Sequence, residues 1–297
     1  MSELRFVEVG PRDGLQNEKA MVPLDAKIAF IDALSQTGVR EIEAGAFVSP
    51  KAVPQMADSG AVLDGIRRER GVKYSALVPN EEGLDRALAA EADKISVFTA
   101  ASETFNKRNI NATIAESIER FRPVVARARQ AKLPVRAYLS TAFHCPFEGR
   151  VSPASTAAVV DRLLALGVGE ISIGDTIGRA SPADVRALLD VVLRRVAPKM
   201  IFLHFHDTYG MAVANALTAW EQYKITGFDA SSGGLGGCPY APGAGGNVAM
   251  EDLAFAFEAN GVKTGIDIAK IKEATAALEP FIGHPMPSHL SKIVLAR

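Results

Sequence analysis

The chain has 297 residues, of which 48% are hydrophobic and 23% charged, and its formal net charge is −1. This balance is ordinary for a globular protein with a sizeable core. It argues against a nucleic-acid-binding protein, which would carry a basic face, and no apolar run reaches the roughly 20 residues that a membrane-spanning helix needs.

The N-terminal sequence "MSELRFVEVG" runs directly into a strand-like pattern, so we expect no signal or transit peptide before it. Two cysteines, Cys145 and Cys238, do not make a disulfide framework, which favours a reducing compartment. We therefore expect a cytoplasmic protein with no nucleic-acid or membrane partner.

Short apolar or β-branched runs alternate with amphipathic segments along the whole chain. In the segment 113–133, apolar residues recur at three- and four-residue spacing, as on one face of a helix. Ser152-Pro153 and Ser181-Pro182 have the sequence of helix starts, with a serine N-cap and proline at the first helical position. The predicted strands are residues 4–9, 39–44, 72–77, 94–98, 135–139, 170–173, 200–205 and 228–231.

Eight strands that alternate with seven or eight helices predict an α/β fold, a closed (β/α)₈ TIM barrel. An open doubly wound sheet is the alternative. It normally carries a G-x-G-x-x-G loop after its first strand, and "GPRDGLQNE" is not such a loop. No Ser- or Gly-rich linker divides the chain. We expect a single domain over residues 1–297, with the barrel over about 1–265 and one or two appended C-terminal helices over 266–297.

Polar residues follow the predicted strands at the point where each strand ends. In a TIM barrel these C-terminal ends together form the active-site rim. A random scatter would place half of them at the other end of the barrel, so their common position indicates a functional site. They are Arg12, Asp13 and Gln16 after the first strand, Glu43 on the second, Asp175 on the sixth, His204, His206 and Asp207 on the seventh, and Asn247 at the end of the loop after the eighth.

His204 and His206 are two residues apart in a strand, so both side chains point to the same face, into the barrel mouth. One hydrogen-bonded core histidine and one exposed histidine are the alternative, but the pair at the rim favours a metal site. Asp13 supplies a carboxylate, and an oxygen donor such as Asn247 would complete the set. These donors suit octahedral Mg²⁺ or Mn²⁺. The open positions would chelate a hydroxyl or carbonyl beside a carboxylate, which suggests lyase or aldol chemistry on a small oxygenated acid.

Five segments carry more specific motifs. They are "VEVGPRDGLQNEK" (7–19), "FVSPKAVPQM" (47–56), "GDTIG" (174–178), "HFHDTYG" (204–210) and "GGLGGCPYAPGAGGN" (233–247). Together they resemble the 3-hydroxy-3-methylglutaryl-CoA (HMG-CoA) lyase family of metal-dependent TIM-barrel enzymes. The resemblance extends from about Val7 to Gly265. Its most specific element is the cysteine-bearing loop 234–247, since the arginine-aspartate and histidine pairs alone mark only the wider superfamily.

The resemblance implies a carbon-carbon lyase that acts on an acyl-CoA thioester. The reaction would be the retro-Claisen cleavage of HMG-CoA to acetyl-CoA and acetoacetate, dependent on a divalent cation. The implied cation ligands agree with the set above: Asp13, His204, His206 and Asn247. The family also implies a homodimer, with the terminal helices as a candidate interface.

The same resemblance assigns roles to the other rim residues. The base that removes the hydroxyl proton is Asp175 or His204, and the enolate is protonated by Cys238 or by water. Simpler roles remain open, because Glu43 can merely support Arg12 and Asp175 can merely cap a loop. The basic segment 106–109 is interpreted as a solvated turn, and a contact with the CoA phosphates is the alternative. The implied roles are enolate stabilisation by Arg12, catalysis by Glu43, Asp175 and Cys238, substrate contact by Gln16, and support of Asn247 by Glu251.

Three segments at the barrel mouth depart from the family pattern: "EAGAF" (43–47), "STAFHCPFEG" (140–149) and "DASSGG" (229–234). They would shape the acyl pocket, so the same chemistry on a related 3-hydroxyacyl-CoA, such as citramalyl-CoA, is an alternative. A Claisen-condensing acyltransferase is a second alternative. The loop "GGCPYA" argues against this acyltransferase, because such synthases carry a charged "GER"-type sequence at that position.

Overall fold

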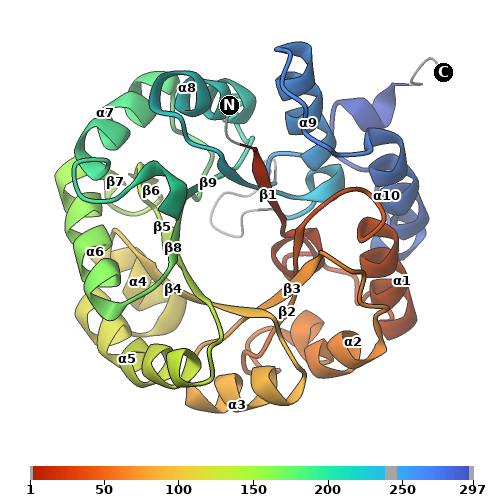
Figure 1. Cartoon of the computed structure of the whole chain (residues 1–297), viewed down its shortest axis with the longest axis horizontal. Coiled ribbons are helices and arrows are strands. Elements are labelled where there is room, and N and C mark those ends of the chain that lie inside the picture. The colour runs from red at the N-terminus through yellow and green to blue at the C-terminus, as the bar shows by residue number, and fades with distance from the viewer. Residues whose placement is uncertain (1–2, 238–245, 294–297) are drawn as a thin grey trace.

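The strands of the chain close into one parallel barrel with the helices outside it (Figure 1). The computed structural model describes residues 3–237 and 246–293. Around the barrel the order is β1-β10-β9-β8-β5-β4-β3-β2, while β6 and β7 form a separate antiparallel pair. The predicted (β/α)₈ barrel is confirmed. The strands are β1 (Arg5–Glu8), β2 (Glu41–Ala46), β3 (Lys73–Leu77), β4 (Lys94–Ala100), β5 (Val135–Ser140), β6 (His144–Cys145), β7 (Gly149–Arg150), β8 (Glu170–Asp175), β9 (Ile201–Phe205) and β10 (Gly227–Ala230).

The helices follow from local sequence signals. The side chains of Ser152 and Ser181 accept hydrogen bonds from backbone N–H groups of the first turn, with proline at N1, as predicted. In the part of the chain described, no helix is both long and apolar enough to cross a membrane. The helices are α1 (Leu24–Leu34), α2 (Ser59–Gly65), α3 (Glu81–Ala89), α4 (Glu103–Ile110), α5 (Ile114–Gln130), α6 (Pro153–Leu166), α7 (Pro182–Val192), α8 (Ala212–Tyr223), α9 (Met250–Ala259) and α10 (Ile268–Ile282).

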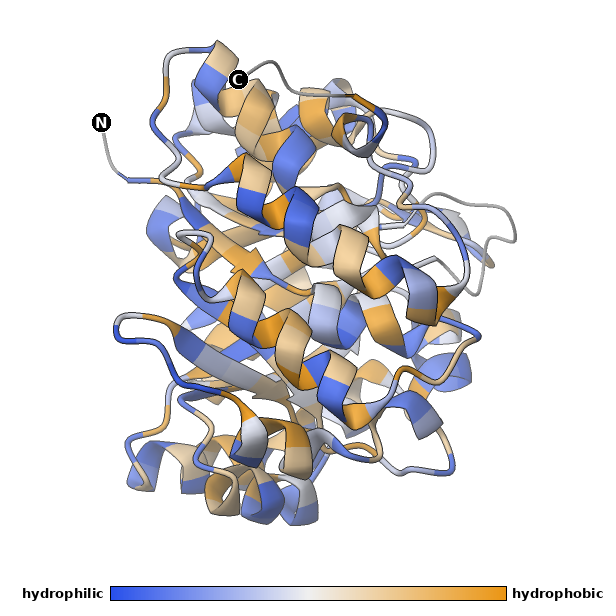
Figure 2. Cartoon of the chain, turned by 90° about the vertical axis from the view of Figure 1, so that its right-hand side faces the viewer, coloured by the Kyte–Doolittle hydropathy of each residue, from blue (hydrophilic) through white to orange (hydrophobic). Residues whose placement is uncertain are grey.

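The C-terminal helix α10 is part of the outer ring. It packs between α1 and α9 and fills the position where the first and last helices of the barrel would otherwise meet (Figure 1). Figure 2 views the molecule from this side, where the outer helices carry hydrophilic residues beside hydrophobic ones. After α10 the described chain contains only one short 3₁₀ turn, Leu290–Lys292.

The interior of the barrel is unusually polar. TIM-barrel interiors are commonly filled by branched apolar side chains. Here Arg136 on β5 forms an ion pair with Asp229 on β10, and the two strands are separated by β8 and β9, so this contact crosses the lumen. Nearer the N-terminal ends of the strands, Lys94 Nζ lies 2.6 Å from a carboxylate oxygen of Glu41. Charge pairs therefore take the place of part of the expected apolar packing.

One local feature differs from the sequence prediction, and a second was not predicted. Residues 106–109, interpreted as a basic turn, form the second half of α4, where Asn106 is buried and donates to the carbonyl of Ala112. The segment after β1 is a single π-helical turn, Gly10–Gly14, in which the N–H of Gly14 donates to the carbonyl of Val9. This turn carries the side chains of residues 12 and 13 at the barrel mouth.

Candidate active site and metal centre

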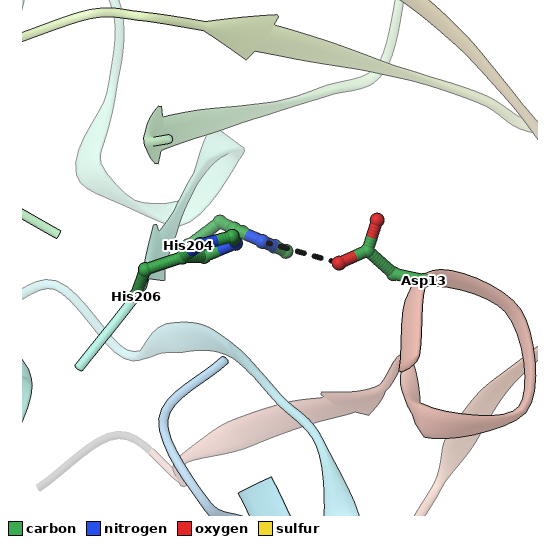
Figure 3. Close-up of side chains that lie close together, drawn as sticks. All are labelled: Asp13, His204 and His206. Carbon is green, nitrogen blue, oxygen red and sulfur yellow. Dashed lines mark ion pairs between the residues drawn. The ribbon is translucent and has the colours of Figure 1, made fainter. Parts of the chain in front are cut away.

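Asp13, His204 and His206 converge at the C-terminal end of the barrel (Figure 3). Each offers one ligand atom, and these atoms lie within 4.8 Å of one another. The carboxylate oxygen Oδ2 of Asp13 is 3.9 Å from Nε2 of His204, and the two imidazole centroids are 5.4 Å apart. Residues nearly 200 positions apart in the sequence thus form one cluster because the barrel brings β1 and β9 to the same rim.

The cluster has the protonation states that a cation site needs, and one of its ring nitrogens has no hydrogen-bond partner. Nδ1 of His206 is buried and has no hydrogen-bond partner among the described residues. Burial lowers the pKa of His206 to about 4, so its imidazole is neutral at neutral pH. Burial alone would raise the pKa of Asp13, but the charge of Arg12 and the electrostatic contributions of His204 and His206 outweigh it and lower this pKa to about 2. A neutral imidazole and a charged carboxylate are the cation-binding forms, so these residues fit a divalent metal.

Asn247 lies against the same cluster and is almost fully buried. Its Nδ2 donates to Oδ2 of Asp13 at 2.8 Å and to the carbonyl of Leu235 at 3.1 Å. Residues 206 and 247 also form an isolated β-bridge. The side-chain amide would have to rotate for its oxygen to face a cation. The four residues predicted as ligands therefore lie together.

Arg12 stands beside this cluster as a buried cation. Its Nε donates to Oε2 of Glu43 at 2.5 Å and its Nη1 to Oδ1 of Asp13 at 2.6 Å. Burial would lower the pKa of Arg12, but the two carboxylates outweigh it, and the pKa lies above the ordinary value. Gln16 Nε2 donates to the same Asp13 oxygen at 3.0 Å. The guanidinium is thus charged and held in one orientation next to the candidate metal centre.

Glu43 holds Arg12 through a network that crosses the barrel. Its carboxylate accepts from the hydroxyl of Ser96 at 2.5 Å and from the hydroxyl of Tyr138 at 3.0 Å, besides its contact with Arg12. The Arg12 guanidinium also lies 5.1 Å from the centroid of the Tyr138 ring. Glu43 is only 1% exposed, so its carboxylate is held inside the barrel by these three partners.

Asp175 ends β8 and caps the loop that follows. Its carboxylate accepts from the backbone N–H groups of Arg179 at 3.1 Å and Ala180 at 2.8 Å. Burial raises the pKa of Asp175 to about 7, although these hydrogen bonds and the nearby His204 oppose the shift. The residue therefore has a structural role and also changes charge near neutral pH.

Two buried glutamates anchor the glycine-rich loop. Glu251, expected behind Asn247, accepts from the N–H of Gly233 at 3.0 Å and so supports the start of this loop. Glu8, which the sequence did not single out, accepts from the N–H of Gly10 at 2.7 Å and from the hydroxyl of Ser232 at 2.5 Å. It links the turn that carries Arg12 and Asp13 to the loop.

Of the two cysteines, the structure describes only Cys145. Cys238, expected on the mobile loop, lies outside the described residues. Cys145 is buried, and its sulfur accepts from the hydroxyl of Ser102 at 3.0 Å and from the N–H of Phe147 at 3.3 Å. These contacts are those of a packed residue.

Sequence reasoning missed the layer of polar side chains beneath the rim. Asp229 lies 3.2 Å from Nδ1 of His204, accepts from Ser172 at 2.6 Å and pairs with Arg136. Tyr138 reaches Glu43 across the lumen. A signal was present, because these residues interrupt apolar strands at alternate positions, and alternate positions of a barrel strand face inward.

Comparison with known proteins agrees with this geometry. Residues 3–278 match the HMGL-like protein family. The chain is 51% identical over 271 residues to the cytoplasmic 3-hydroxy-3-methylglutaryl-CoA lyase of Rattus norvegicus, covering 91% of this chain and 79% of that one. It is 49% identical to the mitochondrial hydroxymethylglutaryl-CoA lyase of Bos taurus, covering 92% and 84%. Among solved structures it resembles an HMG-CoA lyase from Acinetobacter baumannii in complex with coenzyme A and 3-methylmalate. Here the TM-score is 0.91 at 41% identity, covering 98% of this chain and 94% of that one.

Proposed function

The chain belongs to the HMGL-like family, and from this premise we propose that it is a carbon-carbon lyase that cleaves HMG-CoA to acetyl-CoA and acetoacetate. Relatives that are about half identical over most of the chain carry the name of this lyase. The observation that carries the proposal is the grouping of one carboxylate, two imidazoles and one amide beside a buried, charged arginine at the barrel mouth.

The proposed cofactor is Mg²⁺ or Mn²⁺, held by Asp13, His204, His206 and Asn247. Its donor set of two imidazoles, one carboxylate and one amide, with no thiolate, suits a divalent ion that accepts octahedral geometry. When bound, such an ion would orient the tertiary hydroxyl and carboxylate of the substrate and make the hydroxyl more acidic. The unpartnered Nδ1 of His206 supports this assignment, because a buried imidazole nitrogen without a partner is unfavourable unless a ligand satisfies it.

Arg12 has the role of stabilising the enolate. Cleavage leaves a carbanion next to the thioester, and its negative charge develops on the thioester oxygen. A guanidinium that is always protonated and already oriented by Glu43 meets this charge without reorganisation. One preorganised donor of this kind contributes roughly 3 kcal/mol to the transition state. Gln16, whose side chain donates to Asp13, is the proposed substrate contact at the same rim.

Asp175 is the proposed base, with His204 as the second candidate. A base must take the hydroxyl proton as the carbon-carbon bond breaks, and a general base works best when its pKa lies near the working pH. The pKa of Asp175, about 7, meets this condition. The enolate is then protonated to acetyl-CoA by Cys238 or by water.

Asp175→Asn should lower kcat by about 100-fold or more and remove the rise of rate with pH. Only the deprotonated carboxylate accepts a proton, so the wild-type rate should rise as the pH passes upward through about 7. A pH-rate profile from pH 5.5 to 8.5 measures both effects. Asp161→Asn is the control, because Asp161 lies on the outer helix α6, pairs with Arg195 and is not among the groups that shift the pKa of Asp175. If Asp175→Asn keeps the wild-type profile, or the control loses it, Asp175 is not the base.

A panel of pure 3-hydroxyacyl-CoA thioesters tests the substrate. We expect HMG-CoA to be cleaved with the highest kcat/KM, and citramalyl-CoA and longer branched analogues to be cleaved more slowly. Release of acetyl-CoA and of the ketoacid is followed separately for each thioester. Poor turnover of HMG-CoA together with fast turnover of a relative would overturn the substrate assignment but keep the chemistry. Acetyl-CoA-dependent condensation with a 2-oxo acid would overturn the chemistry itself.

The proposed assembly is a homodimer. A groove of about 460 Å³ between α1 and α10 is lined by alanines, Phe30, Leu278 and the half-exposed Phe281, which supports this face as the interface. Light scattering on the purified chain measures the mass, and a monomer at micromolar concentration contradicts the proposal.

The relatives named above include cytoplasmic and mitochondrial forms, so a cytoplasmic location is proposed on the cysteine content alone.

A further inference from the structure

Asp229 lies directly beside His204 on the inner surface of the barrel. The two residues are in register on the neighbouring strands β10 and β9. Oδ2 of Asp229 is 3.2 Å from Nδ1 of His204. A carboxylate accepts hydrogen bonds and does not donate them, so this contact places the imidazole proton on Nδ1. Nε2, the nitrogen that lies 3.9 Å from Asp13, then keeps its lone pair.

The position of Asp229 is itself fixed through both of its oxygens. The hydroxyl of Ser172 donates to Oδ2 at 2.6 Å, and Arg136 forms an ion pair with Oδ1. Asp229 is 2% exposed and Ser172 is fully buried. The carboxylate that contacts His204 therefore has little freedom to turn away.

A buried arginine at position 136 is unfavourable for stability unless its charge is paired. Arg136 is 1% exposed, and within the described residues its Nε and Nη1 have no hydrogen-bond partner. Its guanidinium packs 4.3 Å from the ring centroid of Phe202 and 5.1 Å from that of Tyr138. Buried charge pairs are often no more stabilising than apolar residues of similar size, and unpartnered buried donors are unfavourable. Packing alone therefore does not account for an arginine here, whereas its ion pair with Asp229 gives it a role.

The second histidine of the cluster differs in this respect. Nδ1 of His206 has no hydrogen-bond partner among the described residues, so no carboxylate holds it as Asp229 holds Nδ1 of His204. The two imidazoles are thus held in different ways. Metal-binding histidines commonly donate their second ring nitrogen to a carboxylate, which fixes the tautomer and the orientation of the ring.

We propose that Asp229, held by Arg136 and Ser172, is a positioning residue that keeps His204 as the Nδ1–H tautomer with Nε2 free to bind the cation. This inference rests on the metal site proposed above. It adds to that site a second layer that reaches across the barrel to β5 and β8.

The tautomer is measured directly in the cation-free protein. Histidine labelled with ¹⁵N is incorporated, and the ring signals of the five histidines are recorded, with His204→Gln used to assign His204. We expect the Nδ1–H form for His204 in the wild type. In the double variant Arg136→Met/Asp229→Ala we expect a mixture or the Nε2–H form. An Nε2–H tautomer in the wild type, or an unchanged signal in the double variant, overturns the proposal.

Cation affinity gives a second and independent test. Mn²⁺ binding, followed by the electron paramagnetic resonance signal of the free ion, should weaken about 10- to 100-fold in Arg136→Met/Asp229→Ala. Both members of the pair are replaced because removing Asp229 alone leaves a buried arginine unpaired and threatens folding. Ser172→Ala, which keeps the ion pair, should weaken binding less.

The matched control is Lys94→Met/Glu41→Gln, which removes the ion pairs of Lys94 with Glu41 and Glu170, neither of which touches His204. Glu170 keeps Arg5 as a partner. The control should keep the wild-type affinity for Mn²⁺ and the wild-type tautomer. Equal weakening in the control shows a general loss of barrel packing and overturns the positioning role. Wild-type affinity in Arg136→Met/Asp229→Ala overturns only this inference, whereas a wild-type protein that binds no Mn²⁺ overturns the metal site as well.

Discussion

Exhaustive chelation of divalent cations is expected to abolish the cleavage of HMG-CoA, and addition of Mg²⁺ or Mn²⁺ to restore it. A bound dication stabilises developing charge by several kcal/mol. At 1.36 kcal/mol for each factor of ten, its loss should slow kcat by about 1,000-fold or more. The assay measures acetyl-CoA release before chelation, after it and after the metal is returned. Full activity in the chelated protein would contradict the metal assignment.

Replacement of a ligand separates the cation site from other effects of chelation. His206→Ala should lose Mn²⁺ binding and cleavage together, because His206 is buried in the cluster and its Nδ1 has no other hydrogen-bond partner among the described residues. His289→Ala is the control. That histidine is exposed at the surface and pairs with Asp252. If His206→Ala binds Mn²⁺ as the wild type does, the ligand set is wrong even if the enzyme needs a metal.

Arg12→Met should lower kcat by about 100- to 1,000-fold while substrate binding and metal binding persist. The expected size follows from the roughly 3 kcal/mol that one preorganised donor supplies to a developing oxyanion. Arg12→Lys should recover little of the loss, because an ammonium cannot reproduce the two-nitrogen contact with Glu43 and Asp13. Steady-state kinetics at saturating cation, with Mn²⁺ affinity measured alongside, give the comparison.

Stability must be followed in the same variants. Removing Arg12 leaves Glu43 buried without its cationic partner, which lowers stability by itself. The unfolding midpoint therefore shows whether a fall in kcat comes from folded protein. Arg127→Met, which removes a surface arginine on α5 paired with Glu81 and Asp85, should keep the wild-type kcat. Loss of cation affinity in Arg12→Met with normal kcat at saturating Mn²⁺ would show that Arg12 supports the metal site and not the enolate.

The sequence by itself determined the elements of this protein and the residues at its rim. Strand and helix periodicities are local, so apolar runs such as 200–205 and the serine-proline helix starts at 152 and 181 predicted their elements within a few residues. Once a barrel is expected, the end of each strand is known, and parallel strands carry their C-terminal ends to one rim. His204 and His206 were found in this way.

Only the tertiary structure decided which polar groups pair beneath that rim. Arg136 and Asp229 are 93 residues apart and meet because the sheet closes on itself, which no local pattern encodes. The π-helical turn at Gly10–Gly14 and the place of α10 between α1 and α9 also depend on packing between distant segments. Local propensity specifies where a strand lies and which of its faces is polar. The partner across the lumen is set by how the strands are staggered when the barrel closes. This arrangement gives Nδ1 of His204 a carboxylate partner and leaves Nδ1 of His206 without a hydrogen-bond partner in the described part of the chain.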